Sequence, residues 1–92
     1  VPPGGLRREG AEVVWNPVPG ASGYQVQIEF ITGVVCAIRA EPVDVGPSAS
    51  PSRPIPSSQC PPGGVTRSRV ASQVNGQLAW SGWVDVTPPG GG

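Results

Sequence analysis

The sequence contains no histidine, lysine or methionine, and its charges cancel. Six arginines balance six acidic residues, so the formal net charge is zero at neutral pH. A neutral chain without a basic stripe does not fit nucleic acid or an anionic membrane surface as a partner. No apolar run approaches the roughly 20 residues that span a bilayer as a helix, so membrane insertion is not predicted either.

The absence of histidine also limits the chemistry. General bases and activated nucleophiles need a titratable partner, whereas the acidic residues here are scattered through the chain. Two cysteines without histidine cannot build a four-ligand zinc site within one chain. We therefore predict that the chain is not an enzyme and that it holds no metal and no cofactor.

Residues 24–30 carry the clearest secondary-structure signal. Four apolar residues alternate there with three polar ones, which predicts a strand with one buried and one solvated face. The buried set is Tyr24, Val26, Ile28 and Phe30, and the solvated set is Gln25, Gln27 and Glu29. Asn75-Gly76 predicts a tight turn between antiparallel strands. Further strands are predicted at about residues 11–16, 34–39, 65–72 and 80–87. No segment has helical periodicity, so the predicted fold class is all-β.

Glycine and proline are abundant, with 14 and 13 residues, and they concentrate in a Pro/Ser-rich tract at about residues 41–64. The prolines of this tract exclude a central strand, because each lacks a donor for the sheet ladder. We expect a long irregular insertion within a single domain that spans residues 1–92. The termini, residues 1–5 and 87–92, are predicted to be extended. Because the sequence starts with a valine, we expect a processed chain or a piece of a longer one.

The two cysteines, Cys36 and Cys60, allow two interpretations. They form a structural disulfide that anchors the Pro/Ser-rich tract to the sheet, or they are two buried thiols. The disulfide is favoured because the domain is small and the tract lacks other anchors. A bridge of this loop length stabilises the folded state by about 3 kcal/mol in the chain-entropy model. If it forms, the protein belongs to an oxidising compartment, secreted or at the cell surface.

Several residues in order along the chain resemble a fibronectin type III domain. These are Leu6, Trp15, PVPGASGY at residues 17–24, Trp80-Ser81 and WVDVT at residues 83–87. The resemblance implies an antiparallel β-sandwich of two sheets and about seven strands, with the tryptophan and the tyrosine in the core. The core signature that it implies is Leu6, Trp15, Tyr24, Val26 and Ile28.

The chain departs from the family pattern in its middle. The tyrosine that the family places about three residues before an Arg-Val pair is absent, since Thr66 precedes Arg69-Val70 at that distance. The family's fifth strand is replaced by the Pro/Ser-rich tract. We expect the disulfide to compensate for this missing strand.

Tryptophan and arginine side chains are predicted on one outer face of the sandwich. The set comprises Trp80, Trp83, Arg67 and Arg69. Guanidinium groups stacked on indole rings contribute about 0.5–1 kcal/mol each at exposed sites. Two interpretations follow: a self-satisfied surface ladder that stiffens the sheet, or a docking face for a sugar ring or a neighbouring subunit.

Serines among the prolines of residues 41–64 are typical of an O-glycosylated segment, although an unmodified loop fits them as well. The candidate acceptors are Ser48, Ser50, Ser52, Ser57 and Ser58.

Three functions remain open at this point. The favoured one is a non-enzymatic extracellular structural module: a subunit or repeat of a secreted fibre, a surface appendage or a virion exterior. Its expected partners are copies of itself or neighbouring modules. The second is an adhesion module that binds carbohydrate or protein through the Trp/Arg face. The third is an accessory domain of a larger secreted polysaccharide-degrading enzyme.

Overall fold

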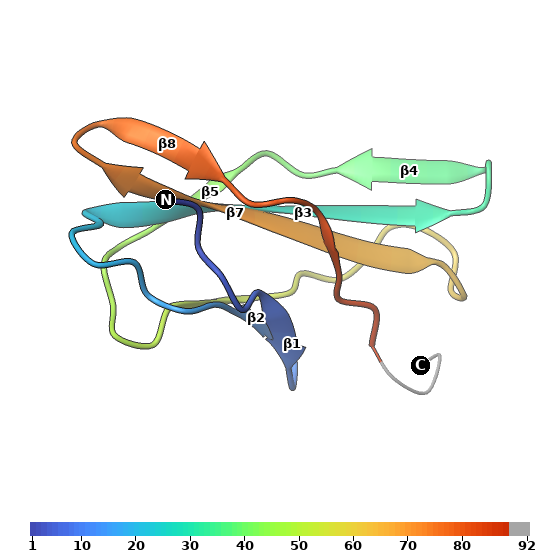
Figure 1. Ribbon diagram of the computed structural model, residues 1–92. Coiled ribbons are helices and arrows are strands. Elements are labelled where there is room, and N and C mark those ends of the chain that lie inside the picture. The colour runs from blue at the N-terminus through green and yellow to red at the C-terminus, as the bar shows by residue number, and fades with distance from the viewer. Residues whose placement is uncertain (89–92) are drawn as a thin grey trace.

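A computed structural model describes residues 1–88 as two antiparallel β-sheets stacked face to face (Figure 1). The predicted all-β sandwich is confirmed. The nine strands are β1 (Arg7–Glu9), β2 (Glu12–Val14), β3 (Gly23–Thr32), β4 (Cys36–Arg39), β5 (Val43–Val45), β6 (Ser52–Pro54), β7 (Val65–Val74), β8 (Gln77–Trp80) and β9 (Val84–Asp85). Within residues 1–88 there is no helix, and so none that could cross a membrane.

The nine strands occupy only seven lateral positions. The small sheet has the order β1-β2-β6, and the large one has the order β4-β3-β7-β8. Strand β5 pairs with β3 on the same side as β4, and β9 pairs with β7 on the same side as β8. Both outer strands of the large sheet are therefore split in two, which reconciles nine segments with the expectation of about seven strands.

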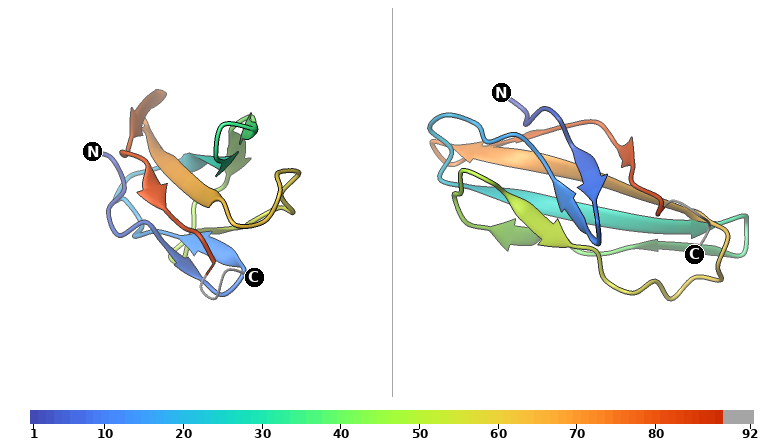
Figure 2. Two further views of the ribbon diagram at one scale, coloured as in Figure 1. Left: turned by 90° about the vertical axis from the view of Figure 1, so that its right-hand side faces the viewer. Right: turned by 90° about the horizontal axis from the view of Figure 1, so that it is seen from below.

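Strands β3 and β7 form the centre of the large sheet and run its whole length (Figure 2). Each has ten residues, and their register runs from Gly23 opposite Gln73 to Ile31 opposite Val65. The turn after β7 is the predicted Asn75-Gly76 pair, whose φ angles are 53° and 78°. Two left-handed residues match the right-handed twist of a two-residue hairpin, so this sequence directs β8 back along β7.

The final strand predicted at residues 80–87 is interrupted in the structure. Strand β8 ends at Trp80 and β9 starts at Val84. At the break, the Ser81 hydroxyl accepts a hydrogen bond from the Val70 amide (3.1 Å). The Ser81 amide still donates to the Val70 carbonyl (2.8 Å), so the backbone departs from β7 only after Ser81.

The Pro/Ser-rich tract contains two short edge strands, which corrects the prediction of an irregular insertion without a fifth strand. Strand β5 pairs with β3, and β6 pairs with β2. Each has only three residues and lies at a sheet edge, where proline is tolerated. Arg53 of β6 donates to the carbonyl of Val26 in the opposite sheet (2.9 Å), and burial lowers the pKa of its guanidinium. A polar bridge thus links the tract to the large sheet.

The core lies between the two sheets. It is formed by the inward side chains of β2, β3 and β7 and by their neighbours: Leu6, Val13, Trp15, Tyr24, Val26, Ile28, Phe30, Val70 and Val86. The rings of Trp15 and Tyr24 meet edge to face, with centroids 5.5 Å apart. The Tyr24 hydroxyl accepts a hydrogen bond from the Val18 amide (2.9 Å), which ties the 17–23 loop to the core. Burial of each large apolar side chain contributes about 1.5–3 kcal/mol.

The predicted disulfide is confirmed. Cys36 and Cys60 are bonded across a separation of 24 residues. Cys36 lies opposite Thr32, on the inward face of β4, so the bridge attaches the tract beneath the large sheet. Thr32 reinforces the attachment, because its hydroxyl donates to the carbonyl of Pro61 (2.7 Å).

Replacing both cysteines with alanine should therefore lower the free energy of unfolding by about 3 kcal/mol. For a domain of this size, the melting temperature should fall by roughly 12–24 °C. Calorimetry measures both quantities. The wild-type protein in reducing agent should have the same melting temperature as the double variant. A wild-type melting temperature that reducing agent does not change would contradict this prediction.

Gly64 generates a second stability prediction. A Cβ atom there would lie 2.1 Å from the carbonyl oxygen of Ile31 and 2.4 Å from the hydroxyl of Thr32. Gly64→Ala must push apart the backbone that joins the tract to β3, so we expect a loss of about 1–3 kcal/mol in urea unfolding. Gly82→Ala is the matched control, because nothing lies within 4 Å of its Cβ position. Equal stability of the two variants would refute the close approach.

Candidate functional site: an arginine–tryptophan ladder

The outer face of the large sheet holds a network of side chains that we call the ladder. Its members are Gln27, Glu29, Arg39, Arg67, Arg69, Trp80 and Trp83. Strand register brings the polar members together: Glu29 of β3 lies opposite Arg39 on one side and Arg67 on the other. Gln27 lies opposite Arg69. Because directly opposed residues of a sheet share a face, the ladder follows from the pairing of β3 with its neighbours.

Trp83 lies at the centre of the positive charge. The guanidinium carbons of Arg39, Arg67 and Arg69 lie 5.1, 5.2 and 4.9 Å from the centroid of its ring. Arg69 also lies 4.5 Å from the centroid of Trp80, so it connects the two indoles. Trp83 was predicted on a strand, but it projects from the break between β8 and β9. The break allows its ring to contact three arginines from two strands.

Glu29 neutralises part of this charge from within the sheet. Its carboxylate accepts hydrogen bonds from Arg39 Nε (2.7 Å) and from Arg67 Nε (3.1 Å) and Nη2. The side chain of Glu29 is only 7% exposed, whereas those of Arg39 and Arg67 are 54% and 36% exposed. The hydrogen bond from Arg67 and then the contacts with Arg39 lower the pKa of Glu29, against the opposing effect of burial.

Gln27 and Glu29 correct the prediction of a fully solvated outer face on β3. Both are buried, at 7% and 6% exposure. Gln27 accepts from Arg69 Nε (2.8 Å) and donates to the carbonyl of Ala40 (3.1 Å). The arginine stems and the indoles cover these polar groups, and each group still finds a partner. Alternation located this face but could not indicate that other side chains would cover it.

The structure places the remaining predicted residues apart from the ladder. Leu6, Trp15, Tyr24, Val26 and Ile28 lie in the core. Ser48, Ser50, Ser57 and Ser58 are exposed in the tract, while Ser52 is half-buried in β6. The Ser48 and Ser58 hydroxyls accept hydrogen bonds from the amides of Ser50 and Cys60. The predicted extended C-terminus is described only to Pro88, and residues 89–92 lie outside the described part.

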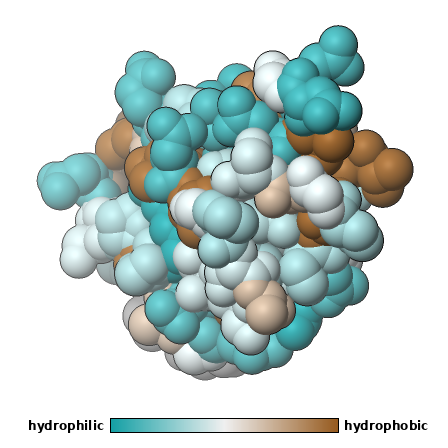
Figure 3. Space-filling view, turned by 90° about the vertical axis from the view of Figure 1, so that its left-hand side faces the viewer, coloured by the Kyte–Doolittle hydropathy of each residue, from teal (hydrophilic) through white to brown (hydrophobic). Residues whose placement is uncertain are grey.

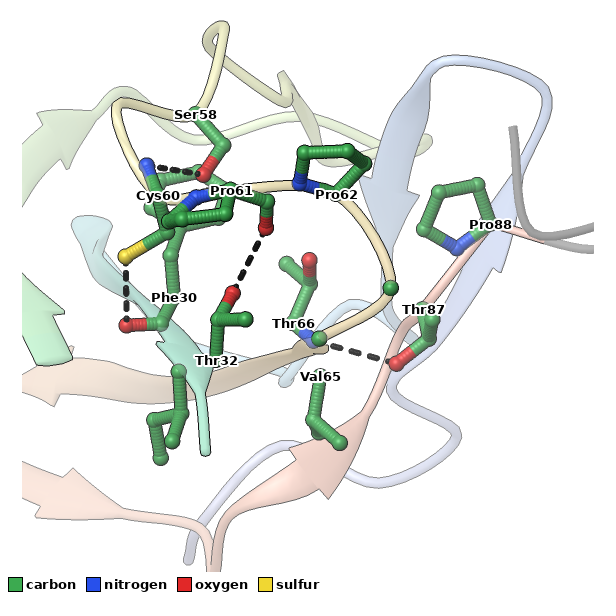
Figure 4. A pocket seen from close by; sticks show the side chains of 13 residues that line it. Phe30, Thr32, Ser58, Cys60, Pro61, Pro62, Val65, Thr66, Thr87 and Pro88 are labelled. Atoms are coloured by element: carbon green, nitrogen blue, oxygen red, sulfur yellow. Dashed lines mark hydrogen bonds between the residues drawn. The ribbon is translucent and has the colours of Figure 1, made fainter. Parts of the chain in front are cut away.

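A small surface hollow of about 120 Å³ lies beside the disulfide, where the tract meets the ends of β3 and β7 (Figure 4). Pro61, Pro62 and Pro88 line it together with Phe30 and other residues. The Cys60 sulfur lies 3.6 Å from the carbonyl oxygen of Phe30. This is a contact without a shared proton, since a disulfide sulfur carries no hydrogen. None of the residues that line the hollow has a titratable side chain.

The ladder has no arrangement suited to proton transfer or nucleophilic attack. Its one carboxylate is engaged by two arginines, and residues 1–88 contain no cluster of potential metal ligands. Its rings are covered by guanidinium groups. No protein-family model, curated protein or solved structure was found to match the chain.

The lowered pKa of Glu29 gives a prediction about acid stability. The unfolded carboxyl titrates near its usual value, and the folded one titrates below it, so the stabilisation is complete above about pH 4.5. It is lost as the pH falls through the lower folded pKa. Glu29→Gln should lower the free energy of unfolding by roughly 1–2 kcal/mol at pH 7, because two arginines lose their counterion. At pH 2 the loss should be much smaller.

Thermal melts between pH 2 and pH 7 measure this difference. Glu12→Gln, at the exposed first residue of β2, is the control, and it should follow the wild type at every pH. A constant gap between the wild type and Glu29→Gln across the whole range would show that the ion pairs do not stabilise the fold.

Proposed function

We propose that this chain is a non-enzymatic structural module of an extracellular assembly. It serves as a subunit or repeat of a fibre, a surface appendage or a virion exterior, and its partners are copies of itself or neighbouring modules. We also propose that it belongs with fibronectin type III-like sandwiches, on the strength of the sequence resemblance.

One observation supports the proposal. The two terminal segments contact opposite ends of the long strand β7. The Val1 carbonyl accepts a hydrogen bond from Ser72, near the β7–β8 hairpin. Thr87 accepts one from the Thr66 amide, six residues back along β7. At about 3.3 Å per residue, the two contacts lie roughly 20 Å apart along the strand. Figures 1 and 2 show Val1 and the segment leading to Pro88 on opposite halves of the molecule.

A module with its ends so placed transmits tension along its strands. The two terminal segments are attached to opposite ends of β7. A pull on them therefore acts on several backbone hydrogen bonds between strands at the same time. The Arg–Trp–Glu ladder supports the same function, because its polar groups satisfy one another across β4, β3 and β7. A network closed on itself stiffens a sheet more readily than it captures a ligand.

The disulfide supports an extracellular location. Such a bridge is compatible with an oxidising compartment and is rare in the cytosol. Secretion or surface display is part of the proposal on this basis. O-linked glycosylation of the exposed serines of the tract is compatible with it.

The test is the shape of chains with one, two and four copies joined through their own terminal segments. One copy is 40 Å long, so small-angle scattering should give a longest dimension that rises by about this length per added copy. Four copies joined by long Gly/Ser linkers are the control and should be more compact for their length. A native four-copy chain as compact as the control would contradict an axial structural module.

Carbohydrate binding through the same face remains the second candidate, favoured by the half-exposed Trp80 and Trp83. Polysaccharide pull-down with the wild type and Trp83→Ala distinguishes it. Binding that is lost in the variant would favour adhesion over a purely structural function.

A further inference from the structure

Two of the four lateral edges of the sandwich, β1 and β6, carry charge or proline that protects them against pairing with another strand. An exposed edge offers unpaired backbone groups, and proteins protect such edges with proline, charge or interruption. Strand β6 contains Pro54 and follows Pro51, and all three residues of β1 are charged. The outer strand beside β7 is broken between β8 and β9.

The outer strand beside β3 is also divided, into β4 and β5, but β4 itself contains neither proline nor a row of charges. The segment 34–39 reads Val-Val-Cys-Ala-Ile-Arg, which contains no proline and only one charge. Its two valines lie in the turn before β4 and are fully solvated, with Val34 at 104% and Val35 at 76% exposure. Two β-branched apolar residues in a tight turn contribute nothing to the core of their own chain.

The pairing pattern identifies which backbone groups of β4 are unpaired. The Ala40 amide donates to the carbonyl of Ile28 (3.0 Å). Hydrogen-bonded and non-hydrogen-bonded positions alternate in an antiparallel pair, so Ile38 and Cys36 also face β3. The amides and carbonyls of Ala37 and Arg39 therefore point away from the sheet. The disulfide lies on the inward face of β4 and leaves this edge uncovered.

We propose that β4 pairs with β4 of a second copy of this chain. A two-fold axis at Ala37 would place each Ala37 opposite the other, and Val35 of one copy opposite Arg39 of the other. The odd-numbered residues, whose backbone groups point away from each sheet, then lie opposite one another. No arginine lies opposite another arginine. The register is self-complementary, as a two-fold interface requires. The two large sheets become one continuous sheet across the axis.

The outer face of the sheet is apolar next to Ala37. Ala37 lies opposite Ile31, and Ile31 lies opposite Val65, which is 42% exposed. This patch adjoins the axis, so a second copy would extend it and shield it. By contrast, the opposite end of the molecule presents mostly hydrophilic side chains with small separate apolar groups (Figure 3). Val34, Val35 and Val65 thus place exposed apolar side chains beside the unpaired edge.

The contact is short, and it should fall below the roughly 1,200 Å² of a stable interface. We therefore expect a weak dimer that forms at high concentration, or when copies are held close together in an assembly. The inference deepens the proposed structural function by naming a lateral contact between modules. It is independent of whether modules join end to end.

The experiment is amide hydrogen exchange of the isolated chain, read by NMR from micromolar to millimolar concentration, with sedimentation on the same samples. Exchange at Ala37 and Arg39 should slow at least tenfold with concentration, while the amides of β8 should not change. Val35→Lys should weaken association at least tenfold, because two lysines would approach the partner's arginines. Leu78→Lys, the same kind of change at an exposed apolar residue of another edge, should leave it unchanged.

Ala37→Pro provides a second variant. It removes the Ala37 amide, which points away from the sheet, and leaves the backbone hydrogen bonds between β4 and β3 in place. A chain that stays monomeric at millimolar concentration would overturn the proposal. A dimer would also overturn it if amide exchange slows at another edge, or if neither β4 variant weakens association. Neither result would affect the scattering of joined copies, so failure here is distinguishable from failure of the axial module.

Discussion

The antiparallel pairing of β3 with β7 is the interaction on which the rest of the structure depends. Nine residue pairs connect the two strands, from Gly23–Gln73 to Ile31–Val65. The even-numbered residues of both strands face the core, and the odd-numbered ones face outward, where four of them belong to the ladder. A slip of one residue would exchange these faces, moving Ile28 outward and Glu29 into the core. Core and ladder are therefore two consequences of one register, and each reinforces it.

The sequence contains most of the information for this register. Alternation at residues 24–30 and the left-handed Asn75-Gly76 turn identify the central strands and the direction of β8. The Cys36–Cys60 bridge was inferable from the small size of the domain and the unanchored tract. The short strands β5 and β6 were not inferable. Three-residue edge segments leave no periodic signal, and their pairing depends on where β2 and β3 already lie.

The ladder was only half visible in the sequence. The tryptophans and two arginines stand out as residue types, but Gln27, Glu29 and Arg39 resemble ordinary solvated strand residues. Their role arises from cross-strand opposition, which requires knowing that β4 pairs with β3 at Glu29–Arg39. Alternation on β3 was a signal that these side chains share a face with Arg67 and Arg69. It could not show that Trp83, released from the sheet by the break at residues 81–83, would cover them.

Both outer strands of the large sheet are interrupted, but the side chains beside the two edges differ. Beside β7, Trp83 in the break contacts Arg67 and Arg69 of that strand. Glu29 of β3 neutralises the charge of Arg67. Beside β3, β4 ends at Arg39, whose guanidinium turns toward Glu29 and away from the edge. The one charge that could repel a second strand is thus withdrawn into the ladder. The Arg39–Glu29 ion pair thus connects β4 to β3 and directs a charge toward the ladder.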